Sequence, residues 1–463
     1  MKKLFKRIII SSLVLYLIFI IVSAVLLFAV HEPKVKEPQI VSSTSLDRVA
    51  LVESGEDGAR IRLSLIEHAQ SNIDISYYIF IDGEFTDSLL GAILAAADRG
   101  VEVRILLDGL PQIVHLKGNL KEGLRGFEVH PKIALKVYEP FNPLLPWAWH
   151  NRLHEKTMVI DGTLALIGGR NIGDKYYLEE VGTARHVKDR DVLILKDNPQ
   201  SILDGIQNYF EELWHHPYSK ASSKTLTARQ VKKRERYNEN LRQRYPSTER
   251  SGVDVDWYEH TIPTESIHFV RNPIGRVNQD PWCLQVLLDL AAQAEESIFV
   301  QSPYVIPSRE MKAEFNRYDI DLEKVDMLTN SLFSSPNPIA KSAYTNHRKK
   351  IVDNGINVYE YQGPDSIHSK TYIFDDVISV VGTFNLDARS SYLDTESMVV
   401  IVSKEFTNEL KNEVQADLDN SLLVARDYTY LLDDQVREGE VSRVERVGVG
   451  VLSKIVLFFE YLL

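Results

Sequence analysis

Cysteine is nearly absent from this 463-residue sequence, and positive charge is in deficit. The single cysteine, Cys283, excludes an intramolecular disulfide and a thiolate metal cluster, and its apolar surroundings, PWCLQVLLDL, predict a buried structural thiol. The formal net charge of −12 disfavours nucleic acid as the main partner, because an acidic protein gains nothing from counterion release. Hydrophobic residues at 44% and charged residues at 25% are ordinary for a globular protein of two to four domains.

Charge is missing altogether from the run between Ile8 and Val30. At 1.5 Å per residue, a helix of this length spans the roughly 30 Å hydrocarbon core of a bilayer. A cleaved signal peptide is the alternative, but the run exceeds the usual length of about 7 to 15 apolar residues and lacks a clear A-x-A site. We interpret residues 1–36 as a basic N-terminus and a single transmembrane anchor in the cell membrane. The positive-inside rule places the N-terminus in the cytoplasm and the rest of the chain outside, because four basic residues precede the run: Lys2, Lys3, Lys6 and Arg7.

The rest of the sequence contains an internal duplication. HEKTMVIDGTLALIGGRN runs from His154 to Asn171, and HSKTYIFDDVISVVGTFN runs from His368 to Asn385. In both copies Lys follows the histidine by two positions, Asp by seven, Gly by fourteen and Asn by seventeen. A chance recurrence of this set has odds of roughly one in 500 or lower. Looser matches follow in the same order and predict two homologous lobes: 71–80 with 296–306, and 100–109 with 324–333.

Apolar β-branched runs alternate with helical patterns in both lobes. This alternation predicts an α/β sandwich in each lobe, layered as βαβ units around a mostly parallel sheet. The charged stretch between the lobes lacks a wide apolar stripe, which is typical of a solvated helical connector rather than of a nucleic-acid arm. The C-terminal stretch is too short and too charged to span a membrane, so it is either a helix packed on the domain or an interfacial helix that touches lipid. The predicted divisions are the first lobe, the connector, the second lobe and the apolar C-terminal helix: 37–227, 228–250, 251–446 and 447–463.

Each motif combines groups that can hold a phosphate. A histidine and a lysine two residues apart on an extended strand lie on one face. The following apolar runs predict a β-hairpin with Asp161 or Asp375 at its turn, which returns the motif asparagine to the histidine strand. These two aspartates either orient the hairpin or the lysine, or take part in proton transfer. If the motifs meet across a pseudo-twofold axis, they form a site of two imidazoles, two lysines and two amides: His154, Lys156, Asn171, His368, Lys370 and Asn385.

That set of groups suits a phosphodiester, whose transition state spreads negative charge over its equatorial oxygens. One neutral imidazole can attack phosphorus to form a phosphohistidine, while the other, protonated, gives its proton to the leaving alcohol and then activates the acceptor. Neither step requires a metal or a cofactor. Each ring needs a carboxylate on its other nitrogen to fix its tautomer. Asp189 in DRDVLIL and Glu396 in TESMVVIV are the candidates, and Asp191 is an alternative to Asp189.

Both motifs resemble the paired HxKxxxxD motifs of the phospholipase D superfamily, each followed by a Gly-x-x-Asn return. Other segments resemble the bacterial cardiolipin synthases and their phospholipase D-like relatives, among them SYYIF, RGVEVRILLDG, GGRNIGD, SPYVIPS and GTFNLDARSSYLDTE. The resemblance covers about residues 50–463. It implies two phospholipase D-like lobes that share one active site.

The resemblance also implies a role for each site residue. His154 and His368 would be the nucleophile and the general acid, with His154 attacking. Asp189 and Glu396 would orient the two histidines. The lysines and asparagines of both motifs would hold the phosphate: Lys156, Lys370, Asn171 and Asn385.

The first copy departs from the common family pattern in one place. Gly169 and Arg170 stand where many relatives have a small hydroxyl residue and an apolar one, whereas the second copy has Thr383. The sequence therefore leaves open whether a hydroxyl group contacts the phosphate in the first lobe.

A tryptophan-rich stretch favours lipid as the substrate. Trp147 and Trp149 lie just ahead of the first motif, and tryptophan favours the bilayer interface, although both residues could equally belong to the core. Together with the anchor, they predict a phospholipid membrane as the partner; no protein partner is identified. The resemblance implies transfer between two phosphatidylglycerols through a phosphohistidine, which gives cardiolipin and glycerol without a cofactor. Hydrolysis of a phospholipid or nucleic-acid diester is the alternative, and a membrane scaffold with a dead site is disfavoured by the intact motifs.

Overall fold

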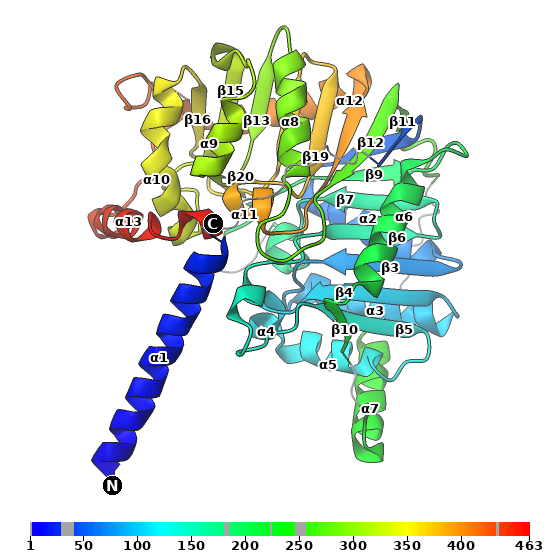
Figure 1. Cartoon of the computed structure of the whole chain (residues 1–463). Helices are drawn as coiled ribbons and strands as arrows, with labels where there is room; N and C mark the ends of the chain where they lie inside the picture. The colour runs from blue at the N-terminus through cyan, green and yellow to red at the C-terminus, as the bar shows by residue number, and fades with distance from the viewer. Residues whose placement is uncertain (1, 29–40, 180–184, 223–224, 246–255, 432–434) are drawn as a thin grey trace.

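The computed structural model describes residues 2–28, 41–179, 185–222, 225–245, 256–431 and 435–463. The predicted boundaries between residues 36 and 37 and between 250 and 251 lie outside these ranges. Two large lobes are stacked on each other (Figure 1). The C-terminal end of the N-terminal helix α1 (Lys2–Phe28) lies beside the lobes, and its N-terminal end points away from them.

The first sheet has nine strands in the order β10-β5-β4-β3-β6-β7-β9-β2-β11. The three strands β3, β4 and β5 run parallel, and every other neighbouring pair is antiparallel. The strands are β2 (Arg48–Val52), β3 (Asn72–Tyr77), β4 (Glu102–Asp108), β5 (Ile133–Tyr138), β6 (Lys156–Ile160), β7 (Leu164–Gly168), β9 (Asp191–Leu195), β10 (Ser219–Ala221) and β11 (Ile262–Pro263).

The second sheet repeats this plan in the order β1-β12-β21-β19-β18-β13-β15-β16-β22. Here β13, β15 and β16 are the parallel strands. The strands are β1 (Val41–Ser45), β12 (Ser266–Arg271), β13 (Ile298–Gln301), β15 (Val325–Asn330), β16 (Asn357–Tyr361), β18 (Thr371–Phe374), β19 (Ile378–Gly382), β21 (Ser397–Val402) and β22 (Ser421–Leu423). Two short parallel pairs complete the strands: β8 (Val187–Lys188) with β17 (Ser366–Ile367), and β14 (Val305–Ile306) with β20 (Leu386–Asp387).

The α/β prediction is confirmed, but the expectation of mostly parallel sheets is wrong. Among the described residues each sheet has only two parallel strand pairs, because the motif hairpin adds antiparallel strands beside β3 in one lobe and β13 in the other. The hairpin strands β6 and β7 are buried along their whole length. Such strands have continuous apolar runs, which are also typical of parallel sheets, so their sequence does not reveal their direction.

The turns of both motif hairpins have the backbone geometry that the sequence indicates. Asp161 and Gly162 have φ of 53° and 63°, and Asp375 and Asp376 have φ of 50° and 57°. Positive φ at both central residues matches the type I′ turn that suits the twist of a hairpin. Each motif therefore folds into a tight hairpin within its own sheet.

Helices cover the outer face of each sheet, while the inner faces pack against each other. Buried side chains of both sheets join one apolar cluster between the lobes, to which α6 (Ile202–His215) and α12 (Lys404–Leu418) contribute. Cys283 is fully buried in the outer layer of the second lobe, as predicted. The outer helices are α2 (Gly55–His68), α3 (Glu84–Asp98) and α5 (Gly118–Phe127) in the first lobe, and α8 (Trp282–Gln293), α9 (Arg309–Phe315) and α10 (Pro338–Asp353) in the second.

The lobes exchange strands at their edges. Strand β1 precedes the first lobe in the chain but pairs with β12 of the second sheet, and β11 pairs with β2 of the first. The predicted segments 37–227 and 251–446 therefore each contribute one strand to the other sheet. The connector forms helix α7 (Ala228–Arg244), which is mostly exposed, although Leu241 packs into the core of the first lobe.

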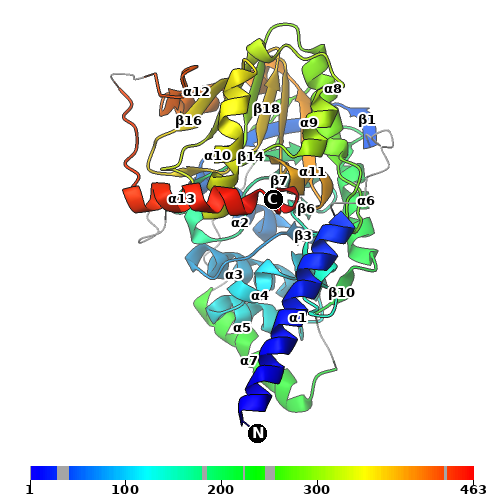
Figure 2. The ribbon, with the colours of Figure 1, turned by 60° about the vertical axis from the view of Figure 1, so that its left-hand side comes forward.

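The C-terminal helix α13 (Arg443–Val456) has one packed face and one exposed apolar face. Val456 packs beside Ala340 and Ala343 of α10. Figure 2 shows this helix across the middle of the view, with the C-terminus of the chain between it and the upper end of α1. The exposed face is formed by Val444, Val447, Val451 and Ile455, and it continues beyond the end of the helix at Phe458.

The remaining short helices in the described part of the chain are α4 (Pro111–His115), α11 (Ala388–Tyr392), η1 (Pro146–Trp149), η2 (Asp174–Tyr176), η3 (Leu322–Lys324) and η4 (Glu460–Leu462).

Helix α1 is long and apolar enough between Phe5 and Ser23 to cross a membrane. Its Tyr16 hydroxyl donates to the carbonyl of Pro143 at 2.6 Å. The ring of Phe19 meets Trp147 edge-on, with ring centroids 6.4 Å apart. The tryptophan-rich stretch ahead of the first motif therefore lies directly against this helix.

Candidate active site

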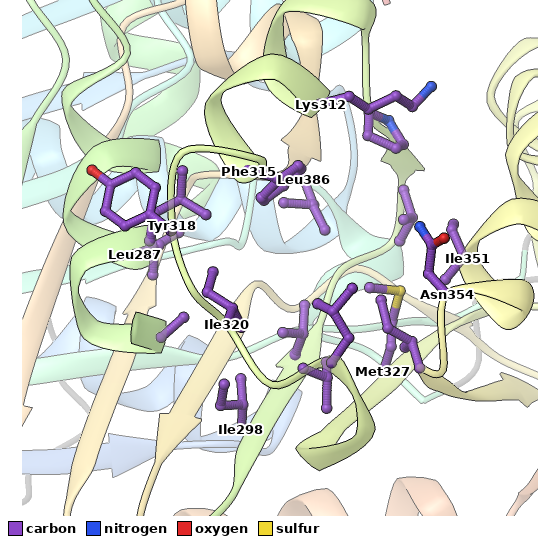
Figure 3. A pocket seen from close by; sticks show the side chains of 18 of the residues that line it. Leu287, Ile298, Lys312, Phe315, Tyr318, Ile320, Met327, Ile351, Asn354 and Leu386 are labelled. Carbon is purple, nitrogen blue, oxygen red and sulfur yellow. The ribbon is translucent and has the colours of Figure 1, made fainter. Parts of the chain in front are cut away.

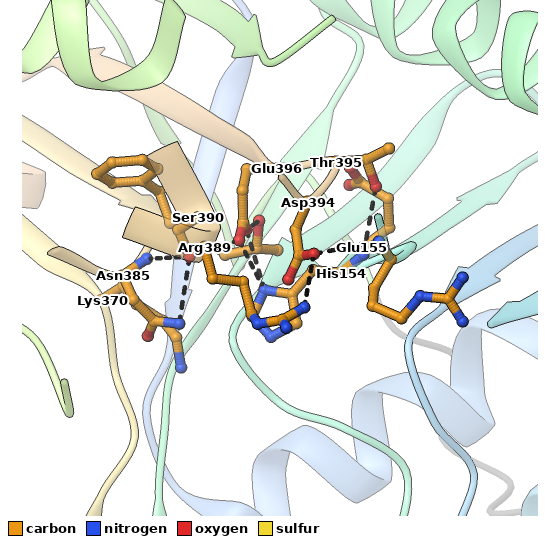
Figure 4. Close-up of polar contacts among 12 residues, drawn as sticks. His154, Glu155, Lys370, Asn385, Arg389, Ser390, Asp394, Thr395 and Glu396 are labelled. Carbon is orange, nitrogen blue, oxygen red and sulfur yellow. Dashed lines mark hydrogen bonds and ion pairs between the residues drawn. The ribbon is translucent and has the colours of Figure 1, made fainter. Parts of the chain in front are cut away.

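His154 lies two residues ahead of β6 and is oriented by a carboxylate of the opposite lobe. Its Nδ1 lies 2.9 Å and 3.0 Å from the two carboxylate oxygens of Glu396, which precedes β21 (Figure 4). The backbone holds this contact, because the N–H of His154 donates to the carbonyl of Thr395 and the N–H of Thr395 donates to that of Arg152. The side chain of His154 is 12% exposed and that of Glu396 is fully buried.

His368 has the reciprocal arrangement. Its Nδ1 lies 2.6 Å from Oδ2 of Asp189, and its backbone N–H donates to the carbonyl of Lys188 at 2.7 Å. The short strands β8 and β17 bring these segments together. The carboxylate that follows each motif therefore contacts the histidine of the other motif, which leaves Nε2 of each ring for chemistry.

The two motif lysines lie beside their own histidines. Nζ of Lys156 donates to the carbonyl of His154 at 2.6 Å, and Nζ of Lys370 lies 2.9 Å from Nδ1 of His368. Burial lowers the pKa of Lys156 to about 7 and that of Lys370 to about 8. An anionic phosphate between them would restore their full charge, so ligand binding and lysine protonation are coupled.

The two motif asparagines have the same unusual feature. The amide nitrogen of Asn171 donates to the hydroxyl of Tyr176 at 3.1 Å, and that of Asn385 donates to the hydroxyl of Ser390 at 3.3 Å. The amide oxygen of each is buried and has no hydrogen-bond partner among the described residues. A buried polar atom left unpaired calls for a partner that these residues do not supply, and the amide orientation is set by the partners present. A half-turn of either amide would present its NH₂ group to a phosphate oxygen.

The two carboxylates have different surroundings. Burial opposes ionisation of Asp189, but His368 and Lys370 outweigh burial and hold its pKa below the ordinary value. Burial raises the pKa of Glu396 to about 8. The oxygens of Glu396 also accept from two hydroxyls, one of which is that of Ser390 at 2.6 Å.

The difference between the two carboxylates affects the protonation of the two imidazoles. Burial and the neighbouring lysines lower the pKa of His154 well below its ordinary value and that of His368 to about 3. The ionised Asp189 opposes this lowering at His368 through both its charge and its hydrogen bond. The negative charge on Asp189 favours a proton on His368, whereas Glu396, whose pKa is raised, gives His154 less support of this kind.

The departure at Gly169 has a structural reason. A Cβ atom on Gly169 would lie 2.1 Å from Oδ1 of Asp189, so no side chain fits there. At the equivalent position of the second lobe, the Thr383 hydroxyl donates to Glu396. This hydroxyl thus supports a carboxylate. Arg170, the other unusual residue, forms a buried ion pair with Asp191 at 2.9 Å.

The structure does not bring Asp161, Asp375 or Asp191 to the histidines. The carboxylate of Asp161 accepts the backbone N–H groups of residues 70, 71 and 72, ahead of β3. That of Asp375 accepts those of residues 295, 296 and 297, ahead of β13. Both aspartates thereby fix the hairpin turn to the neighbouring strand, and Asp191 pairs with Arg62 and Arg170.

Aromatic rings around the histidines are residues that sequence reasoning missed. Tyr78 meets His154 edge-on with centroids 5.0 Å apart, and Tyr176 and Tyr304 meet His368 at 5.8 Å and 6.4 Å. The signal for two of them was present, because Tyr78 and Tyr304 lie in the matched segments 71–80 and 296–306.

Comparison with known proteins identifies the family. Residues 63–214 and 287–418 match the family profile described as cardiolipin synthase, PLD-like domain, and these segments contain both motifs. The chain belongs to this phospholipase D-like family. The predicted superfamily is therefore confirmed.

Relatives of this phospholipase D-like chain are distant but extensive. Cardiolipin synthase C of Escherichia coli is 27% identical over 409 residues, which cover 80% of this chain and 84% of that protein. An uncharacterized protein of Helicobacter pylori is 26% identical over 398 residues, covering 78% and 77%. The crystal structure of a phosphatidylserine synthase of Haemophilus influenzae has a TM-score of 0.63 and 15% identity, and covers 91% of this chain and 98% of that one. The two lobes together therefore have the fold of that phosphatidylserine synthase.

Proposed function

We propose that this enzyme is a phosphatidyltransferase that forms cardiolipin from two molecules of phosphatidylglycerol. The observation that carries the chemistry is the crosswise pairing of His154 with Glu396 and of His368 with Asp189, which gives one site two unequal imidazoles. The names of the relatives, a cardiolipin synthase and a phosphatidylserine synthase, support a phospholipid as substrate. The net charge of −12 disfavours a nucleic-acid diester.

In the first step, Nε2 of His154 attacks the phosphorus of one phosphatidylglycerol. The bond from phosphorus to the glycerol oxygen breaks. His368 gives its proton to that oxygen, because the negative charges of the bound phosphodiester and of Asp189 favour the protonated ring in the complex. The lysine ammonium groups and the rotated amides of the motif asparagines stabilise the charge on the remaining phosphate oxygens. Glycerol leaves, and the phosphatidyl group stays on His154 as a phosphohistidine.

In the second step, a hydroxyl of another phosphatidylglycerol loses its proton to His368 and attacks the phosphorus. The phosphorus–nitrogen bond breaks and His154 is restored. The phosphohistidine keeps the free energy of the original ester, so no nucleotide is needed. Water in place of the acceptor would give phosphatidic acid, which is the alternative hydrolase reaction.

We also infer that the N-terminus faces the cytoplasm and the lobes lie outside. Four basic residues before Ile8 support this orientation through the positive-inside rule. The contact of α1 with Trp147 and the exposed apolar face of α13 support close association with lipid. Protease added to intact spheroplasts should digest the region after Val30, and protection of that region would contradict the orientation.

The activity is tested with the full-length protein in vesicles of phosphatidylglycerol labelled in its head-group glycerol. We expect one glycerol to be released for each cardiolipin formed, and no product from His154→Ala or His368→Ala. Equal release of glycerol and phosphatidic acid without cardiolipin would identify a hydrolase. Normal cardiolipin production by both variants would contradict the whole mechanism.

A further inference from the structure

The outer face of the second sheet is covered by less helix than that of the first. In the first lobe, α3 links β3 to β4, and its buried Leu89 and Ile93 belong to one cluster with Ile73 and Ile75 of the sheet. In the second lobe, the corresponding link from β13 to β15 contains α9, which has 7 residues against 15 in α3. Part of the apolar sheet face in the second lobe therefore lacks a covering helix.

A cavity of about 650 Å³ lies on this face. Ile298 and Val300 of β13 line this cavity. They are equivalent to Ile73 and Ile75 of β3, because the hairpin aspartate of each motif accepts the backbone N–H of the residue just ahead of them, residue 297 in the second lobe and residue 72 in the first. The same alignment of the two lobes places Ala291 of α8 at the position of Ile66 of α2. Ala291 also lines the cavity, whereas Ile66 has a larger side chain and is buried. Figure 3 shows further apolar side chains that line the space: Leu287, Phe315, Ile320, Met327, Ile351 and Leu386.

Basic groups gather where the cavity meets a neighbouring, more polar pocket of about 630 Å³. Lys312, His347 and Lys350 line both spaces, whereas each carboxylate there lines only one of them: Asp353 the apolar cavity, Glu310 and Glu460 the polar pocket. Nζ of Lys312 lies 3.1 Å from Nδ1 of His347, and Nε2 of His347 is hydrogen-bonded to Glu460. Lys350 is exposed. The polar pocket is also lined by Leu457 and Tyr461 of the C-terminal segment, which continues from the exposed apolar face of α13.

We propose that this cavity binds one fatty-acyl chain whose anionic head group is held by Lys312 and Lys350. The volume lies within the roughly 300–1,000 Å³ of known small-molecule sites. Walls of aliphatic and aromatic groups offer water too few partners, so an apolar chain is the fitting occupant. The two lysines at the open end match a carboxylate or a phosphate. His154, His368 and the other proposed catalytic residues do not line the cavity, so the site is separate from the phosphodiester chemistry.

The binding test uses the full-length protein in a sterol-based detergent, which itself offers no alkyl chain. The probe is cis-parinaric acid, a fatty acid whose fluorescence rises in an apolar site. We expect saturable binding that both oleate and lysophosphatidylglycerol displace and that inorganic phosphate does not. Displacement by oleate alone would assign the site to free fatty acids, and displacement by lysophosphatidylglycerol alone to phospholipids. Failure of both competitors would overturn the proposal. No turnover is measured, so the result does not depend on the function proposed above.

Filling the cavity provides the decisive variants. Ala291→Trp should lower the affinity for the probe at least about tenfold and raise the melting temperature of the ligand-free protein, because it fills empty apolar space. Ile320→Trp, in a partly buried loop over the cavity, should also block binding. Ala292→Trp on the exposed side of α8 is the matched control and should bind as the wild type does. Unchanged affinity in both filling variants would refute the site.

The head-group contact is tested separately. Lys312→Gln combined with Lys350→Gln should weaken oleate binding by about tenfold and leave the binding of uncharged dodecanol unchanged. Equal loss for oleate and dodecanol, or no loss for either, would contradict the placement of the anionic group.

Discussion

Replacing Asp189 by asparagine keeps the shape of the side chain and removes its charge. In the folded protein this carboxylate lies 2.6 Å from Nδ1 of His368 and its pKa is held low, so it faces the imidazole as an anion. Unit charges about 4 Å apart at an effective dielectric constant of about 20 attract each other by about 4 kcal/mol. Loss of this energy from the transition state would lower the rate by a factor of about 10³. This factor lies within the range of roughly 10² to 10⁴ that general acid catalysis contributes to rates. We expect Asp189→Asn to slow turnover of phosphatidylglycerol by about 10³.

The leaving group separates this effect from a general loss of activity. A phosphatidyl ester of nitrophenol needs little help from an acid, so Asp189→Asn should form the phosphohistidine from it at a rate within about tenfold of the wild type. Label should then remain on His154, because the base for the acceptor is impaired. Glu396→Gln is the matched variant of the other lobe and should slow labelling by both substrates, since it misorients the nucleophile. Single-turnover labelling with a radioactive acyl chain measures both rates.

Two results would contradict this reasoning. Equal losses with both leaving groups in Asp189→Asn, together with a selective loss in Glu396→Gln, would exchange the roles of His154 and His368. Normal turnover in both variants would show that the crosswise contacts are not the working geometry. Thermal unfolding of each variant provides the control that the fold is retained.

Four further predictions concern other parts of the site. Gly169→Ala places a methyl group 2.1 Å from Oδ1 of Asp189 and should reduce activity at least about tenfold; wild-type activity would show that the carboxylate can move without cost. Asp161→Asn weakens an acceptor of three backbone N–H groups and should lower the free energy of unfolding in urea by about 1–3 kcal/mol with kcat retained; lost turnover at full stability would indicate a chemical role. Burial lowers the pKa of His368 to about 3, so the unfolded chain binds an extra proton below about pH 6.5 and stability falls as the pH falls toward 3. The melting temperature of His368→Gln should therefore change less than that of the wild type between pH 6.5 and 4.5, and an equal change would contradict the buried neutral state. Full activity should survive dialysis against EDTA, because imidazoles, lysines and amides perform every proposed step; loss restored by one divalent ion would contradict this.

The groups of the site could be predicted from sequence because they are encoded locally. The repeated spacing from His154 to Asn171 and from His368 to Asn385 reflects one strand, one turn and one return strand. The candidate carboxylates were found because they precede the next strand of each sheet. All of these features lie within a few tens of residues of each other, where periodicity and turn residues are informative.

The contacts between lobes could not be predicted in this way. Glu396 reaches His154 because Leu153 and Thr395 form a short backbone bridge between the lobes, and no local pattern encodes that bridge. The antiparallel direction of the hairpin strands could not be predicted either, because strands buried on both faces show no alternation of apolar and polar residues. The sequence shows a hydroxyl residue, Thr383, at the position of Gly169 in the second copy, but only the folded chain reveals that this hydroxyl donates to a carboxylate.

Because of the crosswise contacts, the two lobes are expected to evolve together. A change in the length of the carboxylate at position 396 alters the setting of His154 in the other lobe, and a change at position 189 alters that of His368. Either lobe produced alone would keep a complete motif and lose the group that directs its imidazole. Two halves expressed from separate genes should recover activity only when they associate, and selection acts on both halves as a single unit.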